Sequence, residues 1–369
     1  MLKFLLLVAL VAAAANADVP LTLLDKYPNA RCMDGTPGGY YFQPSSNASA
    51  STKWVISLEG GGECATEDSC KSKLNTSLGS TDHRPKSIGS LGFLGTDDCN
   101  ENPVMCQWNR VEVVYCSQDL HSGQRAQPSD ESWGIIFAGK LIVDAIIEDL
   151  EANHGLTEAT EIILSGDSAG GLGTWYHLND LVDRYPQASV YNVPIAGFYF
   201  PAYPYTGPNH TQSGLADFRA EAWPGHVTLW QSHMDQDCQR DMPVNDTWKC
   251  MLANFSYPYM RAPIFIVEAQ TDEVVTTGHD WLPANDIYQP PEQAYLAEWA
   301  ANMTQGLQRA ANSHRDGVFN AACFIHTTFT NSKPRINGLT YHQAMLQWLA
   351  GESMVLIDDC GVICNPTCP

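Results

Sequence analysis

A serine between glycines is the strongest sign of chemistry in this sequence. The motif Gly166-Asp167-Ser168-Ala169-Gly170 stands directly after the apolar run 161–164 and before a stretch with helical periodicity. A serine at such a strand-to-helix turn is lifted away from the backbone, and only small neighbours fit so tight a turn. The context therefore predicts that Ser168 is a nucleophile rather than part of an ordinary glycine-rich turn.

A second glycine cluster, Gly60-Gly61-Gly62, follows the apolar run 54–58. Three glycines let the backbone approach a substrate and aim N–H groups at a developing oxyanion. In hydrolases with the serine motif, such a loop works together with the N–H of the residue after the serine, here Ala169. The alternative is a phosphate-binding loop, but no Gly-Lys-Ser/Thr follows, as that loop requires.

A serine hydroxyl at neutral pH needs a base, and the base needs an orienting acid. In α/β-hydrolases the acid and then the histidine follow the serine in the chain. Asp272 is the preferred acid, because it follows the apolar run 263–267 through a predicted turn at 268–271; the weaker candidates are Glu273, Asp280 and Asp286. His326, directly after the apolar run 321–325, is preferred over the other downstream histidines, which are His279, His314 and His342.

Short apolar runs and longer periodic segments alternate along the chain. The runs predict buried strands at 54–58, 111–115, 161–164, 193–200, 263–267 and 323–325. The periodic segments predict helices at 135–150, 171–185, 292–312 and 340–349. This alternation is typical of an α/β fold, here α/β-hydrolase-like, with a mostly parallel sheet covered by helices on both faces. Ligands bind such sheets at the carboxyl ends of the strands.

The first residues have the pattern of a secretory signal peptide. A basic residue, an apolar run and the small-residue site Ala15-Asn16-Ala17 predict cleavage before Asp18. The remaining residues, 18–369, contain no repeat or linker and predict a single catalytic domain. All 12 cysteines lie in this part and predict a disulfide-stapled fold, in which Cys323 tethers the loop of His326. Six Asn-x-Ser/Thr triplets are consistent with a secreted glycoprotein.

The composition also excludes several partners. The formal net charge of −21 repels nucleic acid and anionic membrane surfaces. After the signal peptide no apolar stretch reaches the length of a membrane span. We therefore expect a secreted, extracellular monomer without nucleic-acid partners.

Several segments together resemble the pectin acetylesterase/Notum family of secreted carboxylesterases. They include LEGGGEC, WNRVEVVYC, LSGDSAGGLG, FIVEAQTD, CFIH and the closing CGVICNPTC. The resemblance implies that Ser168 is the nucleophile, Asp272 the acid and His326 the base. It also implies that the N–H groups of Gly61, Gly62 and Ala169 form the oxyanion hole, and that no cofactor or metal is needed.

The sequence departs from the family where the acyl group would lie. Relatives often carry an aromatic residue where Gly62 stands, so the wall of the acyl pocket differs. The segment YCSQDLHSG is similar to Notum, and the cysteine-rich tail is similar to the plant enzymes. We expect removal of O-acyl groups, most simply O-acetyl, from an extracellular polysaccharide such as pectin in the cell wall or matrix. The alternatives are a deacylase of longer chains on a protein or lipid, of the Notum or general carboxylesterase/lipase kind, and a non-catalytic glycan-binding protein.

Overall fold

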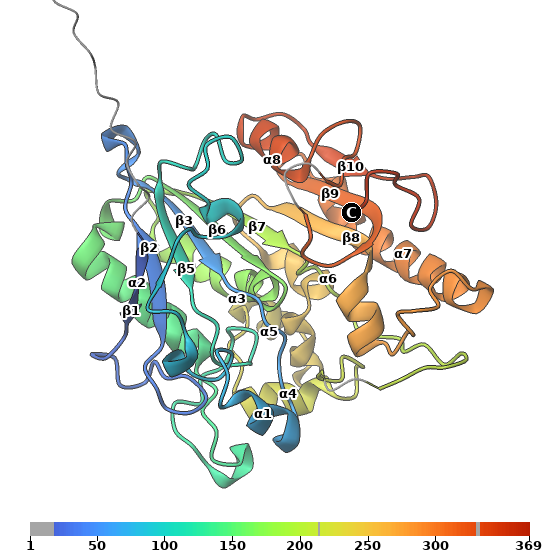
Figure 1. Cartoon of the computed structure of the whole chain (residues 1–369), viewed down its shortest axis with the longest axis horizontal. Coiled ribbons are helices and arrows are strands. Elements are labelled where there is room, and N and C mark those ends of the chain that lie inside the picture. The colour runs from blue at the N-terminus through green and yellow to red at the C-terminus, as the bar shows by residue number, and fades with distance from the viewer. Residues whose placement is uncertain (1–17, 213–214, 330–332) are drawn as a thin grey trace, which may run out of the picture.

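The computed structural model describes residues 18–369 except 213–214 and 330–332. The predicted signal peptide, residues 1–17, lies outside the described residues. The described strands form one ten-stranded sheet in the order β10-β9-β8-β7-β6-β3-β5-β2-β1-β4. Figure 1 shows the N-terminal strands toward one edge of this sheet and the C-terminal strands toward the other.

Most of the sheet is parallel, as predicted. Neighbouring strands run parallel from β5 through to β10 in the order of the sheet. These strands are β3 (Lys53–Leu58), β5 (Asn109–Val113), β6 (Glu161–Asp167), β7 (Ser189–Ile195), β8 (Phe265–Asp272), β9 (Gly317–Ile325) and β10 (Val355–Ile357). Beyond β5, three strands that the apolar runs did not predict continue the sheet in antiparallel fashion: β1 (Val19–Leu23), β2 (Gly39–Gln43) and β4 (Ser87–Ile88).

Two hydrophobic cores lie on the two faces of the sheet. Alternate residues of β6 point to opposite faces, so that Ile162 and Leu164 join one core and Ile163 joins the other. The helices α2 (Gly139–His154), α3 (Ala169–Arg184) and α7 (Pro290–Ala311) contribute to the first core, and α8 (Tyr341–Leu349) contributes to the second. Covering both faces explains why the parallel strands are apolar on both sides.

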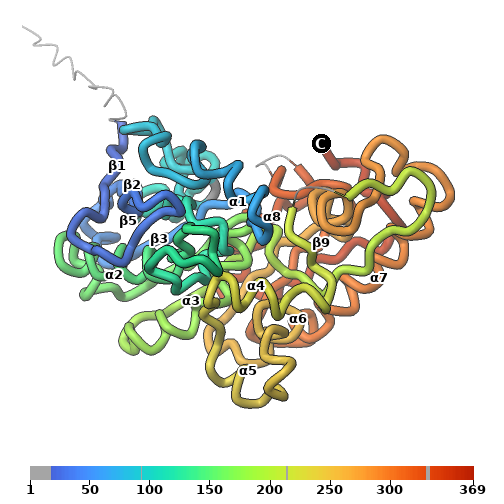
Figure 2. Tube along the Cα trace, turned by 90° about the horizontal axis from the view of Figure 1, so that it is seen from below, coloured from blue at the N-terminus to red at the C-terminus, as the bar shows by residue number. Residues whose placement is uncertain are grey.

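The remaining α-helices are short and follow β3 and β7. They are α1 (Glu67–Lys73), α4 (Trp223–Trp230), α5 (Gln236–Asp241) and α6 (Ala253–Ser256). In Figure 2, α2 and α7 lie toward opposite ends of the molecule, with α3, α4 and α6 between them. Among the residues that the structure describes, no helix combines the length and the apolar character that a bilayer crossing requires.

Each predicted strand differs at one end or both from the strand in the structure, and two of the differences affect the surroundings of the site. The strand predicted at 193–200 is wrong at both ends. β7 spans Ser189–Ile195, and the left-handed Ala196, with φ of +48°, follows its last residue. The run at 263–267 begins a longer strand, since β8 continues to Asp272. The turn predicted at 268–271 is therefore wrong. Its polar residues are strand residues with buried partners: Glu268 accepts the N–H of Phe198, for example.

The cysteines pair completely, in six disulfides. Cys323 in β9 bonds to Cys368 and so ties the strand that precedes His326 to the C-terminal segment. Cys64, two residues after the last glycine of the loop, bonds to Cys70 in α1. The disulfides therefore hold two of the segments that carry the predicted site residues.

Candidate active site

Ser168 forms the sharp turn between β6 and α3. Its backbone has φ of +54° and ψ of −123°, and its N–H donates to the carbonyl oxygen of Ile195. Positive φ is uncommon for a residue with a side chain. A Cβ atom on Gly170 would lie 1.9 Å from the carbonyl oxygen of Leu58. The glycine of the motif is thus required by the close approach of α3 to β3.

His326 lies between Ser168 and Asp272. Its Nε2 is 2.7 Å from the Ser168 hydroxyl oxygen, and its Nδ1 is 2.7 Å from a carboxylate oxygen of Asp272. Since a carboxylate accepts hydrogen bonds, Nδ1 donates and Nε2 is left with its lone pair toward the serine. The three side chains come from the carboxyl ends of β6, β8 and β9, which is where the fold predicts a site.

Asp272 is completely buried at the last position of β8. One carboxylate oxygen accepts the N–H of Val275, and the other accepts both His326 and, at 3.4 Å, the hydroxyl of Tyr199. These contacts fix the plane of the carboxylate. The fixed carboxylate in turn fixes the orientation of the His326 imidazole.

Four of the rival acids and bases have other surroundings, whereas another rival, His279, lines the pocket beside Ser168. Glu273 is exposed, and Asp280 accepts hydrogen bonds from Tyr295 and Trp299. His314 is exposed, and His342 is buried within α8. The structure thus places the preferred residues together, and within the part of the chain that it describes none of these four alternatives forms a hydrogen bond with Ser168.

Negative charges around His326 favour its protonated form. Burial opposes a charge on the ring, but Asp272, its hydrogen bond and the charges of Asp167 and Glu273 together raise the pKa of His326 above its usual range. Burial and the charge of Glu59 also raise the pKa of Asp167 to about 7. Because its own pKa is raised, the imidazole of His326 is a stronger base than that of a free histidine, which suits removal of a proton from a serine hydroxyl.

The glycine loop is held by side chains that follow β5. Gln118 donates to the carbonyl oxygen of Gly61 at 3.0 Å, and the hydroxyl of Tyr115 donates to that of Gly62 at 2.9 Å. Gly61 and Gly62 have φ of +149° and +71°, which favour glycine. Because the N–H and C=O of a trans peptide point in opposite directions, the bond from Gln118 also fixes the direction of the Gly62 N–H.

A pocket of about 330 Å³ joins these parts. Gly61, Gly62, Ser168, Ala169 and His326 all line it, together with apolar side chains of which Leu172, Leu215, Phe218 and Val275 are examples. All three predicted oxyanion donors thus border the same space as the serine. Such an arrangement can bind an ester carbonyl with its oxygen toward the backbone and its acyl group toward the apolar wall.

Some residues of the site were missed by the sequence analysis. Tyr115 and Gln118, which support the glycine loop, were noted only as part of family-like segments. Glu63 was noted only as part of the segment LEGGGEC, and His279 was considered only as a base; both line the pocket. The position of Glu63 directly after the three glycines is the one signal that could have drawn attention to it.

Comparison with known proteins agrees with this fold. The pectinacetylesterase family matches residues 12–369. Pectin acetylesterase 5 of Arabidopsis thaliana is 28% identical over 97% of this chain and 86% of its own length. The human palmitoleoyl-protein carboxylesterase NOTUM is 26% identical over 97% of this chain and 74% of its own length. The solved structure of the Wnt deacylase Notum from Drosophila superposes with a TM-score of 0.82 and 25% identity, over 96% of this chain and 100% of that chain.

These findings give both the enzyme class and the family of the chain. With a Notum-like fold and relatives named as esterases over nearly its whole length, the chain is a carboxylic ester hydrolase. It belongs to the pectinacetylesterase family.

Proposed function

We propose that the chain is a secreted serine esterase that removes O-acetyl groups from an extracellular polysaccharide such as pectin. The observation that carries the proposal is the unbroken chain of contacts from the Ser168 hydroxyl through His326 to Asp272, with 2.7 Å at each step. The family match and the pectin acetylesterase relatives support the substrate class.

The proposed cycle has two similar halves. His326 takes the proton of Ser168 as its oxygen attacks the ester carbonyl, and Asp272 stabilises the imidazolium. The N–H groups of Gly61, Gly62 and Ala169 bind the oxyanion, and loss of one such donor typically costs about 3 kcal/mol of transition-state stabilisation. His326 then protonates the leaving alcohol, and water, activated by the same imidazole, hydrolyses the acyl-enzyme to release acetate.

Secretion is part of the same proposal. The signal-peptide pattern at 1–17 and the six disulfides support an oxidising, extracellular location. The six Asn-x-Ser/Thr triplets support glycosylation there. We propose that the mature chain acts in the cell wall or matrix as a monomeric single domain.

The test is acetate release by the purified protein from acetylated polysaccharides and from p-nitrophenyl acetate. We expect Ser168→Ala to lower kcat by roughly 10⁶-fold. Ser165→Ala is the matched control, because Ser165 lies in β6, the strand that precedes Ser168, with its hydroxyl bonded to the carbonyl oxygen of Val193. If the Ser168→Ala variant hydrolysed the substrates as fast as the wild type, the proposed mechanism would be refuted. If the wild type itself released no acetate, a non-catalytic glycan-binding protein would be favoured.

A second candidate is deacylation of longer chains on a protein. The apolar walls of the 330 Å³ pocket and the likeness to Notum favour it. Comparing acetyl with octanoyl and palmitoleoyl esters separates the two functions, since a long-chain deacylase gains from each methylene that it buries.

A further inference from the structure

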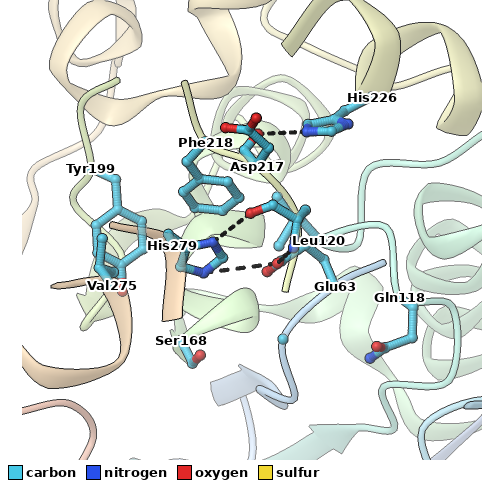
Figure 3. A network of polar contacts seen from close by, with 12 residues as sticks. Glu63, Gln118, Leu120, Ser168, Tyr199, Asp217, Phe218, His226, Val275 and His279 are labelled. Atoms are coloured by element: carbon cyan, nitrogen blue, oxygen red, sulfur yellow. Dashed lines mark hydrogen bonds and ion pairs between the residues drawn. The ribbon is translucent and has the colours of Figure 1, made fainter. Parts of the chain in front are cut away.

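Two ionisable side chains lie in the otherwise apolar part of the pocket. Glu63 is 3% exposed and His279 is 4% exposed, and both line the cavity beside Ser168. Figure 3 shows them facing one another on the same side of the cavity as Phe218, with Ser168 nearby. The proposed catalytic cycle uses neither residue. A buried acid and imidazole at this position therefore need another explanation.

The pair is held rigidly by the backbone of Ala216. The Glu63 carboxylate accepts the N–H of Ala216 at 3.1 Å, and His279 Nδ1 is 2.8 Å from its carbonyl oxygen. Because a carbonyl only accepts, Nδ1 carries the proton and donates. The ring of Phe218 stacks on His279 with centroids 3.8 Å apart and an interplanar angle of 16°. Neither side chain can swing away from the pocket without breaking these contacts.

Glu63 and His279 do not form a hydrogen bond with one another. His279 Nε2 lies 3.8 Å from the nearer oxygen of Glu63, which is beyond hydrogen-bond distance. The polar edges therefore retain bonding capacity toward the cavity. Water or a polar group of a ligand can use that capacity, whereas an alkyl chain cannot.

Apolar side chains also form part of the cavity wall. Leu172, Leu215 and Val275 line the same cavity. A volume of 330 Å³ falls in the range of pockets that enclose drug-sized ligands, so space alone does not exclude long acyl chains. The chemistry of the wall, rather than its size, then decides which acyl groups bind.

We infer that Glu63 and His279 form a polar limit of the acyl pocket that selects short acyl groups over long alkyl chains. A short acyl group leaves the pair in contact with water, whereas a longer chain covers it and removes its hydration without replacing the hydrogen bonds. This inference rests on the proposed esterase function and specifies the acyl group for that same site.

The test is the ratio of kcat/KM for p-nitrophenyl octanoate to that for p-nitrophenyl acetate. The double variant Glu63→Leu/His279→Leu removes both polar groups, so that neither is left buried without its neighbour. We expect the ratio to rise by at least about 10-fold, which is the discrimination typical of a changed pocket contact. His342→Leu is the matched control, because it replaces a buried histidine in α8 outside this pocket, and it should leave the ratio unchanged.

A second measurement, the melting temperature with and without octanoate, tests binding in the pocket without catalysis. In a Ser168→Ala background, added octanoate should raise the melting temperature of the double variant more than that of the protein with Glu63 and His279 intact. The milder Glu63→Gln/His279→Gln variant, which keeps polar groups of similar size, should behave as the unsubstituted pair does and serves if the leucine variant fails to fold.

The outcomes separate this inference from the proposed function. Absence of Ser168-dependent hydrolysis in the wild type refutes the proposed function, while the octanoate shift still reports on the pocket. Ser168-dependent hydrolysis with an unchanged ratio in the leucine variant refutes the polar limit alone. The polar limit is also refuted if the wild type hydrolyses p-nitrophenyl octanoate with the same kcat/KM as p-nitrophenyl acetate.

Discussion

At the scale of single residues, the backbone conformation of Ser168 determines its contact with His326. Ser168 has a positive φ, a conformation that for a residue with a side chain typically costs about 1–3 kcal/mol. The surrounding structure maintains it through the bond to Ile195 and the close packing of Gly170. This conformation directs the hydroxyl to His326 Nε2. The local strain therefore has a chemical consequence, which is a nucleophile already in contact with its base.

The pH dependence of activity follows from the pKa of His326. Its pKa is raised, with Asp272 as the largest favourable influence against burial. Since the base must be neutral, kcat/KM should rise with pH through this raised pKa, so that the acid limb lies above the ordinary histidine value of about 6.5. Asp272→Asn removes the charge and should move the acid limb to lower pH while also lowering kcat by several orders of magnitude.

The pH profile of kcat/KM on p-nitrophenyl acetate measures this shift. Glu273→Gln is the control, because Glu273 contributes the smallest of the named charge effects and is exposed. Its acid limb should move much less than that of Asp272→Asn. Equal shifts in the two variants would contradict the assignment of Asp272 as the dominant partner.

At the scale of elements, the sequence predicted the centre of the sheet better than its edges. The β6–turn–α3 unit was predictable because its glycines, apolar run and helical period are all local. The strands β1 and β2 depend on antiparallel pairing with distant partners, and β10 is only three residues long. Their apolar runs are short, and whether such a run forms a strand depends on the partners against which it packs.

The end of β8 shows why polar residues mislead a sequence-based prediction. Glu268 and Gln270 indicated a turn, but they are buried strand residues with partners far along the chain, Phe198 and Asp358. The placement of Asp272 and His326 at strand ends was nevertheless predictable, since parallel strands bring their carboxyl ends to one edge. The Glu63–His279 contact was not, because only the finished fold brings together residues so far apart.

The disulfide Cys323–Cys368 ties β9, the strand directly before His326, to the C-terminal segment. It closes a loop with a sequence separation of 45. Chain entropy then predicts a loss of about 4 kcal/mol of stability for Cys323→Ser/Cys368→Ser. The matched control is Cys360→Ser/Cys364→Ser, whose separation of 4 predicts a loss of only about 2 kcal/mol. Chemical denaturation measures both, and an equal loss in the two variants would contradict the loop-length argument.

At the scale of the whole molecule, the net charge bears on the substrate. The chain carries 41 acidic and 20 basic side chains, for a net charge of −21. Pectin is itself a polyanion, so the enzyme and this substrate repel one another at long range. The family match and the charge therefore point in different directions unless screening removes the repulsion.

Salt dependence with a charged and a neutral substrate resolves this conflict. The screening length falls from about 30 Å at 0.01 M salt to about 8 Å at 0.15 M, so the repulsion should then act only between groups in near contact. We expect KM for acetylated polygalacturonate to fall several-fold over this range, measured by acetate release, and KM for acetylated xylan, which lacks the dense charge, to change little. A KM for the polyanion that is lowest at low salt would instead mean that a local basic surface binds it. Because kcat depends on the enclosed site at Ser168, it should stay nearly constant with both substrates, which separates long-range repulsion from an effect of salt on the catalytic residues.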